Sequence, residues 1–248
     1  MNLSHALRLT PHDVVAFVGA GGKTTTMFRL ANEIVQTGGR VITTTTTRLG
    51  LDQLSLAPVH VQLHPLPEGS EPSGSFDELH RALEKSKHVL FTGEIDHVEE
   101  KVRGVSLKDF GSLRDFRSLV LIEADGSKQL PFKAPAEHEP VIPDFATQVV
   151  VVVGVDALGK PLTNEYVHRP EIVARLAQTR VGTIINSEII AKVLTHPDGG
   201  FKNVPPSARV SVLINKVESD EQLKAAREIA DQTLRVLRST PQRSGVGE

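Results

Sequence analysis

The feature that most constrains this chain is a glycine-rich turn between a strand pattern and a helix pattern. Residues 14–18 form an apolar, β-type run, and helical spacing begins at Lys23. Glycines let backbone N–H groups approach an anion without a Cβ atom in the way, and a helix start adds unpaired N–H donors. This order predicts a loop that holds phosphate groups. The residues expected to contact them are Gly19, Ala20, Gly21, Gly22, Lys23, Thr24 and Thr25.

In this interpretation Lys23 reaches the β- and γ-phosphates of a nucleoside triphosphate, and the Thr24 hydroxyl ligates Mg²⁺. One position departs from the usual motif, because Phe17 stands where a glycine is expected ahead of the Gly-Lys pair. The match is therefore the shorter form Gly-x-x-Gly-Lys-Thr. The alternative is a glycine turn that binds nothing, but such a turn does not need lysine followed by threonine at this point.

Composition excludes several other classes of site. The 248 residues carry a formal net charge of −2 and include no cysteine, which excludes disulfides, thiolate zinc sites and cysteine nucleophiles. With no tryptophan and no basic excess, a nucleic-acid surface is not expected. The longest apolar run, residues 149–153, is too short to span a bilayer, and residues 1–12 lack the apolar stretch of a signal peptide. We expect a cytoplasmic protein without membrane contact.

Strand and helix patterns alternate along the chain, which favours an α/β fold with a mostly parallel central sheet between two helix layers, as in P-loop NTPases. We expect one domain over residues 1–240, a disordered tail at 241–248, and a surface loop at 64–75. The expected strands are 14–18, 40–45, 88–91, 118–123, 148–153 and 209–214. The expected helices are 23–36, 76–85, 169–178, 186–194 and one that begins at Ser219.

Two carboxylates follow the apolar run at residues 119–122. In open α/β sheets, ligands bind at the carboxyl edge of the strands, where Glu123 and Asp125 are expected to lie. In P-loop proteins such a strand-end acid holds the Mg²⁺ shell or orients the attacking water. With Lys23 they are the predicted catalytic residues, and Glu123, Asp125 and Thr24 the predicted metal ligands. The alternative is an ordinary acidic turn after a buried strand.

Two neighbouring segments extend the predicted site. Residues 126–133 have the composition of a mobile loop that senses the γ-phosphate, where Lys128 and Lys133 either contact phosphate or a second substrate or are solvated surface charges. Five threonines at 43–47 precede Arg48, and their carboxyl end is expected at the same edge of the sheet. There Thr46, Thr47 or Arg48 could contact Mg²⁺ or phosphate, and Thr46 is a further predicted metal ligand, although a purely strand-forming role is equally consistent.

A possible base-recognition motif follows the strand at 209–214. Asn215-Lys216-Val217-Glu218 is nearly the Asn-Lys-x-Asp motif that reads guanine in GTPases, with Glu218 where aspartate is usual. The extra methylene displaces the carboxylate, so the motif favours GTP over ATP only slightly. The alternative is a helix-capping turn.

Seven segments together carry a resemblance to a known family. They are residues 18–26, 41–49, 123–128, 133–143, 154–162, 167–171 and 196–202. In this order they resemble the YqeC-like P-loop family, whose members are described as accessory proteins of selenium-dependent molybdenum hydroxylases. The resemblance implies an Mg²⁺-dependent NTPase whose partners are ATP or GTP and a molybdenum hydroxylase or its cofactor.

Three functions are consistent with these residues. The first is a nucleotide-dependent accessory protein in which hydrolysis switches the 126–133 loop. The second is a kinase, ligase or other transferase that acts on a small molecule, and the third is a protein that holds nucleotide without turnover. His168 and His196 are candidates for a second anion or metal site, or mark helix boundaries, and His138 is a candidate general base or a plain surface histidine.

Overall fold

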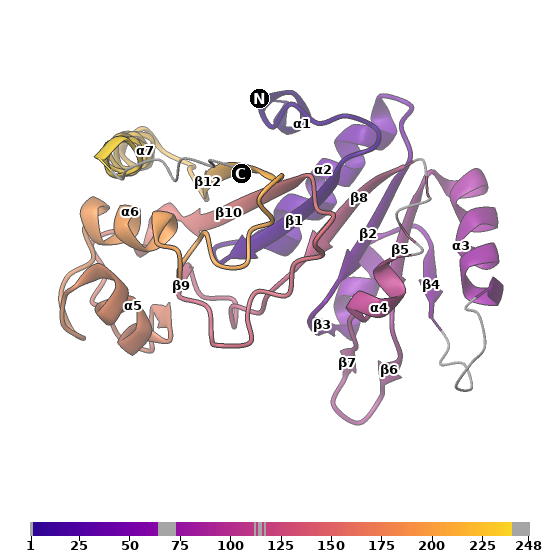
Figure 1. Cartoon of the computed structure of the whole chain (residues 1–248), viewed down its shortest axis with the longest axis horizontal. Helices are drawn as coiled ribbons and strands as arrows, with labels where there is room; N and C mark the ends of the chain where they lie inside the picture. The colour runs from indigo at the N-terminus through magenta and orange to yellow at the C-terminus, as the bar shows by residue number, and fades with distance from the viewer. Residues whose placement is uncertain (1, 64–72, 112, 114–115, 117, 240–248) are drawn as a thin grey trace, which may run out of the picture.

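The computed structural model describes residues 2–63, 73–111, 113, 116 and 118–239. Its centre is a seven-stranded sheet in the order β12-β10-β1-β8-β2-β5-β4, in which every pairing is parallel (Figure 1). The strands are β1 (Val14–Gly19), β2 (Val41–Thr45), β4 (His60–Gln62), β5 (His88–Thr92), β8 (Leu119–Glu123), β10 (Gln148–Gly154) and β12 (Arg209–Asn215).

Helices cover both faces of this sheet. They are α1 (Leu3–Ala6), α2 (Lys23–Gln36), α3 (Ser73–Ser86), α4 (Leu107–Phe110), α5 (Pro170–Ala177), α6 (Ser187–Thr195) and α7 (Asp220–Ser239). In Figure 1, α5, α6 and α7 lie at the β12 end of the sheet and α3 at the other end. The α/β fold with a mostly parallel central sheet between two helix layers, predicted from the sequence, is confirmed.

The two faces of the sheet bury two separate cores because strand side chains alternate in direction. On β1, Val14, Ala16 and Val18 join the core that contains α3, α5, α6 and α7. Val15 and Phe17 face the other way and pack with α1 and α2. Every residue of β10 is buried, which is why its sequence is a run of valines and not an alternating pattern. Because both faces of the sheet are packed, the position at which each strand ends is fixed. The loops that follow the strands are therefore held in place as well.

Smaller elements flank the carboxyl edge of the sheet. A separate antiparallel sheet has the order β3-β7-β6, formed by β3 (Leu49–Gly50), β6 (Ile95–Asp96) and β7 (Lys101–Val102). A parallel pair joins β9 (Phe132–Lys133) to β11 (Val167–His168). The 3₁₀ turns are η1 (Leu51–Leu56) and η3 (Val155–Ala157).

The structure corrects one expectation about segment type and adds one strand to the central sheet. Residues 73–75 belong to α3 and not to the predicted surface loop, because the first turn of that helix precedes its first buried side chain, Phe76, and so lacks apolar spacing. Strand β4 was not predicted, since three residues are too few for a clear alternating pattern. The rest of the predicted loop and the predicted tail lie outside the described residues.

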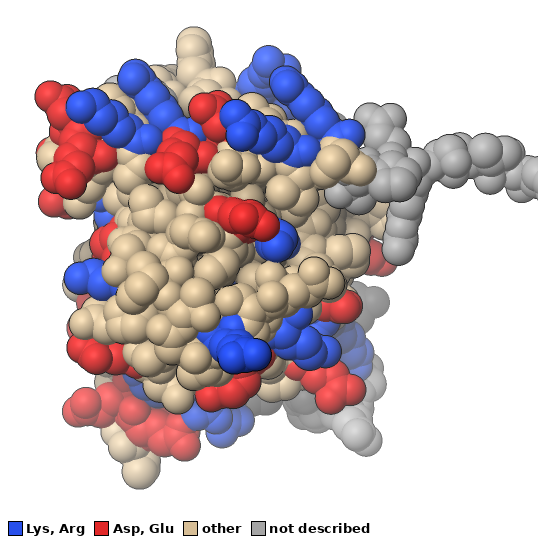
Figure 2. All heavy atoms as spheres, turned by 90° about the vertical axis from the view of Figure 1, so that its left-hand side faces the viewer, with Lys and Arg blue, Asp and Glu red and all other residues tan. Residues whose placement is uncertain are grey.

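The predictions that the protein contacts neither a membrane nor a nucleic acid concern its helices and its surface charge. Within the described ranges, no helix is long and apolar enough to cross a membrane. Figure 2 shows the face at the β12 end of the sheet, where Lys and Arg side chains are interspersed with Asp and Glu, most of them around the edge of a large uncharged area. Among the described residues of that face, positive side chains lie beside negative ones.

Candidate functional site

The glycine loop lies tightly against the ends of β10 and β12. Gly19, Gly21 and Gly22 have φ angles of 93°, 84° and 109°, a region that favours glycine. A Cβ atom at Gly19 would clash with the carbonyl of Val152, and one at Gly22 would lie 2.6 Å from the side-chain nitrogen of Asn215. The glycines therefore serve close backbone packing as well as approach to a ligand.

Three backbone amides of the glycine loop already donate hydrogen bonds within the protein. Fewer amides are therefore available to a phosphate group than the sequence predicted. The Gly19 amide donates to Asp125 at 3.0 Å, the Ala20 amide to the Val152 carbonyl at 2.9 Å, and the Gly21 amide to the Leu130 carbonyl at 3.1 Å. The amides of residues 23–25 lie in the first turn of α2, where no helical carbonyl precedes them. In this conformation the donors open to an anion are those at 22–25 and not those at 19–21.

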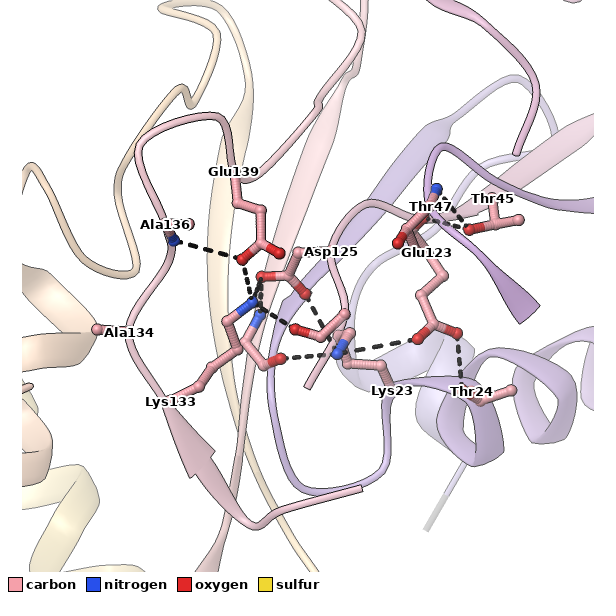
Figure 3. A network of polar contacts seen from close by, with 12 residues as sticks. Lys23, Thr24, Thr45, Thr47, Glu123, Asp125, Lys133, Ala134, Ala136 and Glu139 are labelled. Carbon is pink, nitrogen blue, oxygen red and sulfur yellow. Dashed lines mark hydrogen bonds and ion pairs between the residues drawn. The ribbon is translucent and has the colours of Figure 1, made fainter. Parts of the chain in front are cut away.

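Lys23 is almost completely buried, with 2% of its surface exposed. Its ammonium group donates to the Gly19 carbonyl at 2.7 Å and lies 3.2 Å from Asp125 and 3.8 Å from Glu123 (Figure 3). The lysine side chain thus folds back across its own loop. Its charge is compensated by the two carboxylates that follow β8, so the three predicted catalytic residues do lie together.

Glu123 faces the start of α2. The Thr24 hydroxyl donates to its carboxylate at 2.6 Å, and the strand end is fixed by the Thr45 hydroxyl, which donates to the Glu123 carbonyl at 2.9 Å. Burial raises the pKa of Glu123, and the charge of Lys23 and the bond from Thr24 offset only part of this effect. A carboxylate and a hydroxyl oxygen at this spacing are hard ligands of the kind that Mg²⁺ prefers.

Asp125 is two residues further along and faces a different environment. One of its oxygens accepts the Gly19 amide and lies 2.9 Å from the ammonium group of Lys133, whose side chain is 1% exposed. Its other oxygen is buried and makes no hydrogen bond among the described residues, although Lys23 lies 3.2 Å away. Asp125 therefore links the glycine loop, through Gly19, to Lys133 of β9.

A line of charges continues from Asp125 through buried Lys133 to half-buried Glu139 and Arg169, and sequence reasoning missed most of it. Lys133 donates to Glu139 at 2.8 Å and to the Gly126 carbonyl at 2.6 Å, and Arg169 holds both Glu139 oxygens at 2.8 and 3.1 Å. Burial would raise the pKa of Glu139, but the bonds from Arg169 and Lys133 outweigh it and lower that pKa to about 2. The alternative that Lys133 is a solvated surface charge is wrong, because its side chain is 1% exposed and has three polar partners. Contact of Lys133 with phosphate stays a prediction that these contacts do not favour.

An open cavity of about 500 Å³ lies over the glycine loop. This volume falls within the usual range for small-molecule sites. Its charged lining includes five cations and two carboxylates, so it favours an anionic ligand. The lining residues are Gly22, Lys23, Thr24, Thr25, Arg48, Gly50, Asp52, Gln53, Lys101, Glu123, Gly126, Ser127, Lys128, Gln129 and Lys216.

Several predicted site residues do not line this cavity. The Thr46 hydroxyl donates to the Val141 carbonyl at 2.8 Å, and the Asn215 side chain donates to the Gly21 carbonyl at 2.9 Å. Glu218 is exposed after β12, and its backbone amide is bound by Gln222. Asn215 therefore supports the glycine loop here, and metal ligation by Thr46 and base contact by Glu218 stay predictions that these contacts do not favour.

Lys216 does line the cavity and has an unpredicted partner. Its ammonium group lies 2.8 Å from Asp156, which follows β10, and Gly154 of β10 pairs with Asn215 of β12. The two strand ends thus bring Asp156 beside the nearly guanine-type motif. Sequence spacing could not show this, because 60 residues separate the two partners.

The candidate histidines are dispersed. His138 is exposed, and His196 accepts the Asp198 amide at 3.0 Å at the end of α6. His168 lies on β11, and burial together with Arg169 and Lys133 lowers its pKa to about 4. No group of three metal-ligating side chains is found in the part of the chain that the structure describes.

The comparisons with known proteins match the chain to one family. The model of the family described as "YqeC protein" matches residues 15–171, which is more than half of the chain. This chain belongs to the YqeC family. The match includes the glycine loop, the Glu123 and Asp125 pair and the buried charges as far as Arg169, so the YqeC family resemblance proposed from the sequence is confirmed.

One relative and one solved structure give the extent of the likeness. The protein is 37% identical over 221 residues to the uncharacterized protein YqeC of Escherichia coli K12, covering 87% of this chain and 80% of the relative. It is also similar to the signal recognition particle 54 kDa protein of Aeropyrum pernix in complex with GDP, at 16% identity and a TM-score of 0.28. That match covers 92% of this chain, which spans 49% of the solved chain.

Proposed function

We propose that this protein binds a nucleoside triphosphate with Mg²⁺ in the cavity over the glycine loop and hydrolyses it. The observation that carries the proposal is the contact between Thr24 and Glu123 at 2.6 Å, beside the buried ammonium group of Lys23 and at the floor of an anion-favouring cavity. A turn that binds nothing has no need to bury a lysine and two carboxylates at the start of a helix.

In this function the amides at residues 22–25 donate to the phosphates. The Lys23 ammonium group leaves the Gly19 carbonyl and turns to the β- and γ-phosphate oxygens. Thr24 and Glu123 are the residues that would hold Mg²⁺, which when bound neutralises charge that develops on the phosphate oxygens. Lys128 and Lys216, which also line the cavity, supply further positive charge.

Glu123 is the better metal candidate of the two carboxylates. It lines the cavity, whereas Asp125 is engaged by the Gly19 amide and by Lys133. Asp125 is therefore proposed as a positioning residue that holds Lys23 and the glycine loop. Glu123 is also the candidate general base, which would accept a proton from a water molecule beside the γ-phosphate.

Base choice rests on the Lys216 end of the cavity. GTP is slightly favoured over ATP because Asn215 and Lys216 retain two members of the guanine motif, and Asp156 rather than Glu218 is the carboxylate at this end. We further propose, from the family resemblance, that hydrolysis serves maturation of a selenium-dependent molybdenum hydroxylase. The hydroxylase or its cofactor would be the client.

Calorimetry tests the proposal directly. Wild-type protein is titrated with ATP and with GTP, each with and without Mg²⁺, and phosphate release is then followed at saturation. We expect binding that requires Mg²⁺ for full affinity and at least tenfold weaker binding in Lys23→Ala. We expect no change in Lys192→Ala, which removes a lysine of α6 that does not line the cavity. Absence of binding of both nucleotides to the wild type would contradict the proposal.

A second candidate function is transfer of the terminal phosphoryl group to a small molecule. The observation that favours it is the extent of the cavity, which continues beyond the glycine loop to Arg48 and Lys101. Phosphate release without any acceptor supports hydrolysis, whereas turnover that appears only with a low-molecular-weight acceptor supports transfer.

A further inference from the structure

The cavity extends to both sides of the glycine loop. Lys216 follows β12 and Arg48 follows β2, and these strands lie on opposite sides of β1, each two strands away from it. Because neighbouring strands are about 4.8 Å apart, each end of the cavity lies roughly 10 Å from the loop. A triphosphate seated on the loop extends its nucleoside towards one end only. If the nucleoside takes the Lys216 end, the Arg48 end is left for something else.

The Arg48 end is a built surface, which we call the second wall and define as Arg48, Asp52, Gln53 and Lys101. It is carried by β3, η1 and β7, whose Leu49 and Val102 are 1% and 0% exposed and pack in the same core as α2. Leu49 pairs with Val102 across these strands, and Gly50 with Lys101. Since strand side chains alternate, burial of Leu49 and Val102 turns Arg48 and Lys101 to the cavity side.

The second wall is also fixed relative to β2. The Val105 amide donates to the Thr45 carbonyl at 2.8 Å, and the Leu51 amide to the Glu100 carbonyl at 3.2 Å. A Cβ atom at Gly104 would lie 2.6 Å from the Thr47 carbonyl oxygen, so the β7 segment packs directly on the threonine run. The five threonines therefore place this wall beside the ligand edge of the sheet.

The cations of the second wall are available to a ligand. Arg48 pairs with Glu99, but both side chains are more than half exposed, and such a pair contributes little and exchanges readily with another anion. Lys101 has no ion-pair partner among the described residues. Asp52 and Gln53 add polar groups that can accept or donate hydrogen bonds beside these two cations.

We propose that the second wall binds the anionic group of a second small molecule, bearing a carboxylate or a phosphate, next to the triphosphate. Arg48 and Lys101 recognise the anion, and Asp52 and Gln53 bind polar groups of the same molecule. The proposal takes the position of the triphosphate from the proposed function, but the anion site itself depends only on the second wall.

The test uses protein saturated with Mg²⁺ and a triphosphate whose β,γ-bridge is an imido group, which prevents hydrolysis. Inorganic phosphate and acetate are titrated separately by calorimetry, so that the two classes of anion are distinguished. We expect one of them to bind this complex, and at least tenfold more weakly in the double variant Arg48→Gln, Lys101→Gln. Arg103→Gln is the matched control, because Arg103 is 58% exposed on the same segment but does not line the cavity.

Equal anion affinity in the wild type and the double variant overturns the proposal, as does binding that occurs only by displacing the triphosphate. A loss in Arg103→Gln as large as in the double variant also overturns it, because the effect is then one of general charge. If the wild type binds no triphosphate, the proposed function fails. Phosphate and acetate are then titrated into Lys23→Ala protein, in which the lysine of the glycine loop is absent, with and without the two substitutions of the second wall. Binding there that still requires Arg48 and Lys101 supports the second wall, and binding without them contradicts it.

Discussion

Glu123 and Asp125 are two residues apart at the end of one strand, yet they lie in two different regions. Glu123 lines an open cavity and is contacted by one hydroxyl, from Thr24, with Lys23 at 3.8 Å. Asp125 lies behind the glycine loop, where an amide and the ammonium groups of Lys23 and Lys133 surround it. Strand β8 ends at Glu123, so Asp125 lies beyond the strand, where regular alternation no longer sets the direction of its side chain. The two carboxylates therefore have different surroundings (Figure 3).

Glu123 is thus the carboxylate that can bind a ligand in the cavity, whereas Asp125 and the charges behind it hold the glycine loop in place. The charges behind the loop alternate in sign from Asp125 through Lys133 and Glu139 to Arg169, so each is compensated by its neighbours. A buried charge with such partners costs far less than an isolated one, but removing one partner leaves the others uncompensated. Variants on the two sides should therefore fail in different ways.

The largest expected effect is on stability, from Glu139→Gln. This substitution removes the negative charge that both Lys133 and Arg169 contact. Because Glu139 and Arg169 are half-buried, we expect a loss of about 3 kcal/mol, at the lower end of the cost of breaking a buried pair. Urea denaturation measures the loss. The matched control is Glu188→Gln, which breaks the exposed helical pair with Lys192 and should cost less than about 0.5 kcal/mol. A loss below about 1 kcal/mol in Glu139→Gln would show that the buried charges do not support one another.

The next effect is on activity, from Glu123→Gln. If Glu123 holds the metal, hydrolysis should fall at least 100-fold, or about 2.7 kcal/mol, whereas the free energy of unfolding changes by less than about 1 kcal/mol. Stability is spared because burial already raises the pKa of Glu123 and disfavours its charge. Phosphate release and urea denaturation on the same protein give both values. In Asp125→Asn we expect both to fall, and equal behaviour of the two variants would remove the distinction between the two carboxylates.

A smaller, pH-dependent effect comes from a buried histidine without a charged partner. Burial lowers the pKa of His88 from 6.5 to about 4, so the folded protein holds it neutral while the unfolded chain binds a proton at higher pH. Stability is therefore complete above pH 6.5 and falls as the pH drops towards 4, by about 2 kcal/mol between pH 7 and pH 5. The measurement is urea denaturation at pH 7 and at pH 5. In His88→Gln the loss of unfolding free energy between these two pH values should be about 2 kcal/mol smaller than in the wild type. His138→Gln, which alters an exposed histidine, should lose as much as the wild type.

The smallest effect is expected at the predicted base-recognition motif. Glu218→Ala should change the ratio of GTP to ATP affinity less than twofold, because Glu218 is exposed and does not line the cavity. Lys216→Ala, in the same motif, should weaken binding of both nucleotides about tenfold, since Lys216 does line it. Calorimetry compares the two variants. A large loss of GTP preference in Glu218→Ala would restore the original motif assignment.

Local pattern was enough to predict the parts of this molecule that depend on neighbours in the sequence. The order of β1, glycine turn and α2 and the parallel sheet follow from short-range spacing, because strand and helix periods and glycine conformation are local properties. The start of α3 did not follow in this way, and the family came from the resemblance of seven segments. The same reasoning predicted that Lys23, Thr24 and Glu123 lie close together, since they sit in one turn and at one strand end.

Tertiary structure alone decided what those residues contact. The partners of the loop come from residues 100 or more positions away, as with Gly19 and Asp125, 106 residues apart, and Asn215 and Gly21, 194 residues apart. Which carboxylate faces the cavity, which loop amides stay open, and whether Lys133 is a ligand or a buried ion-pair partner all depend on sheet order and on packing between distant segments. Electrostatic compensation and side-chain burial are properties of the folded arrangement, and no periodicity in the chain encodes them.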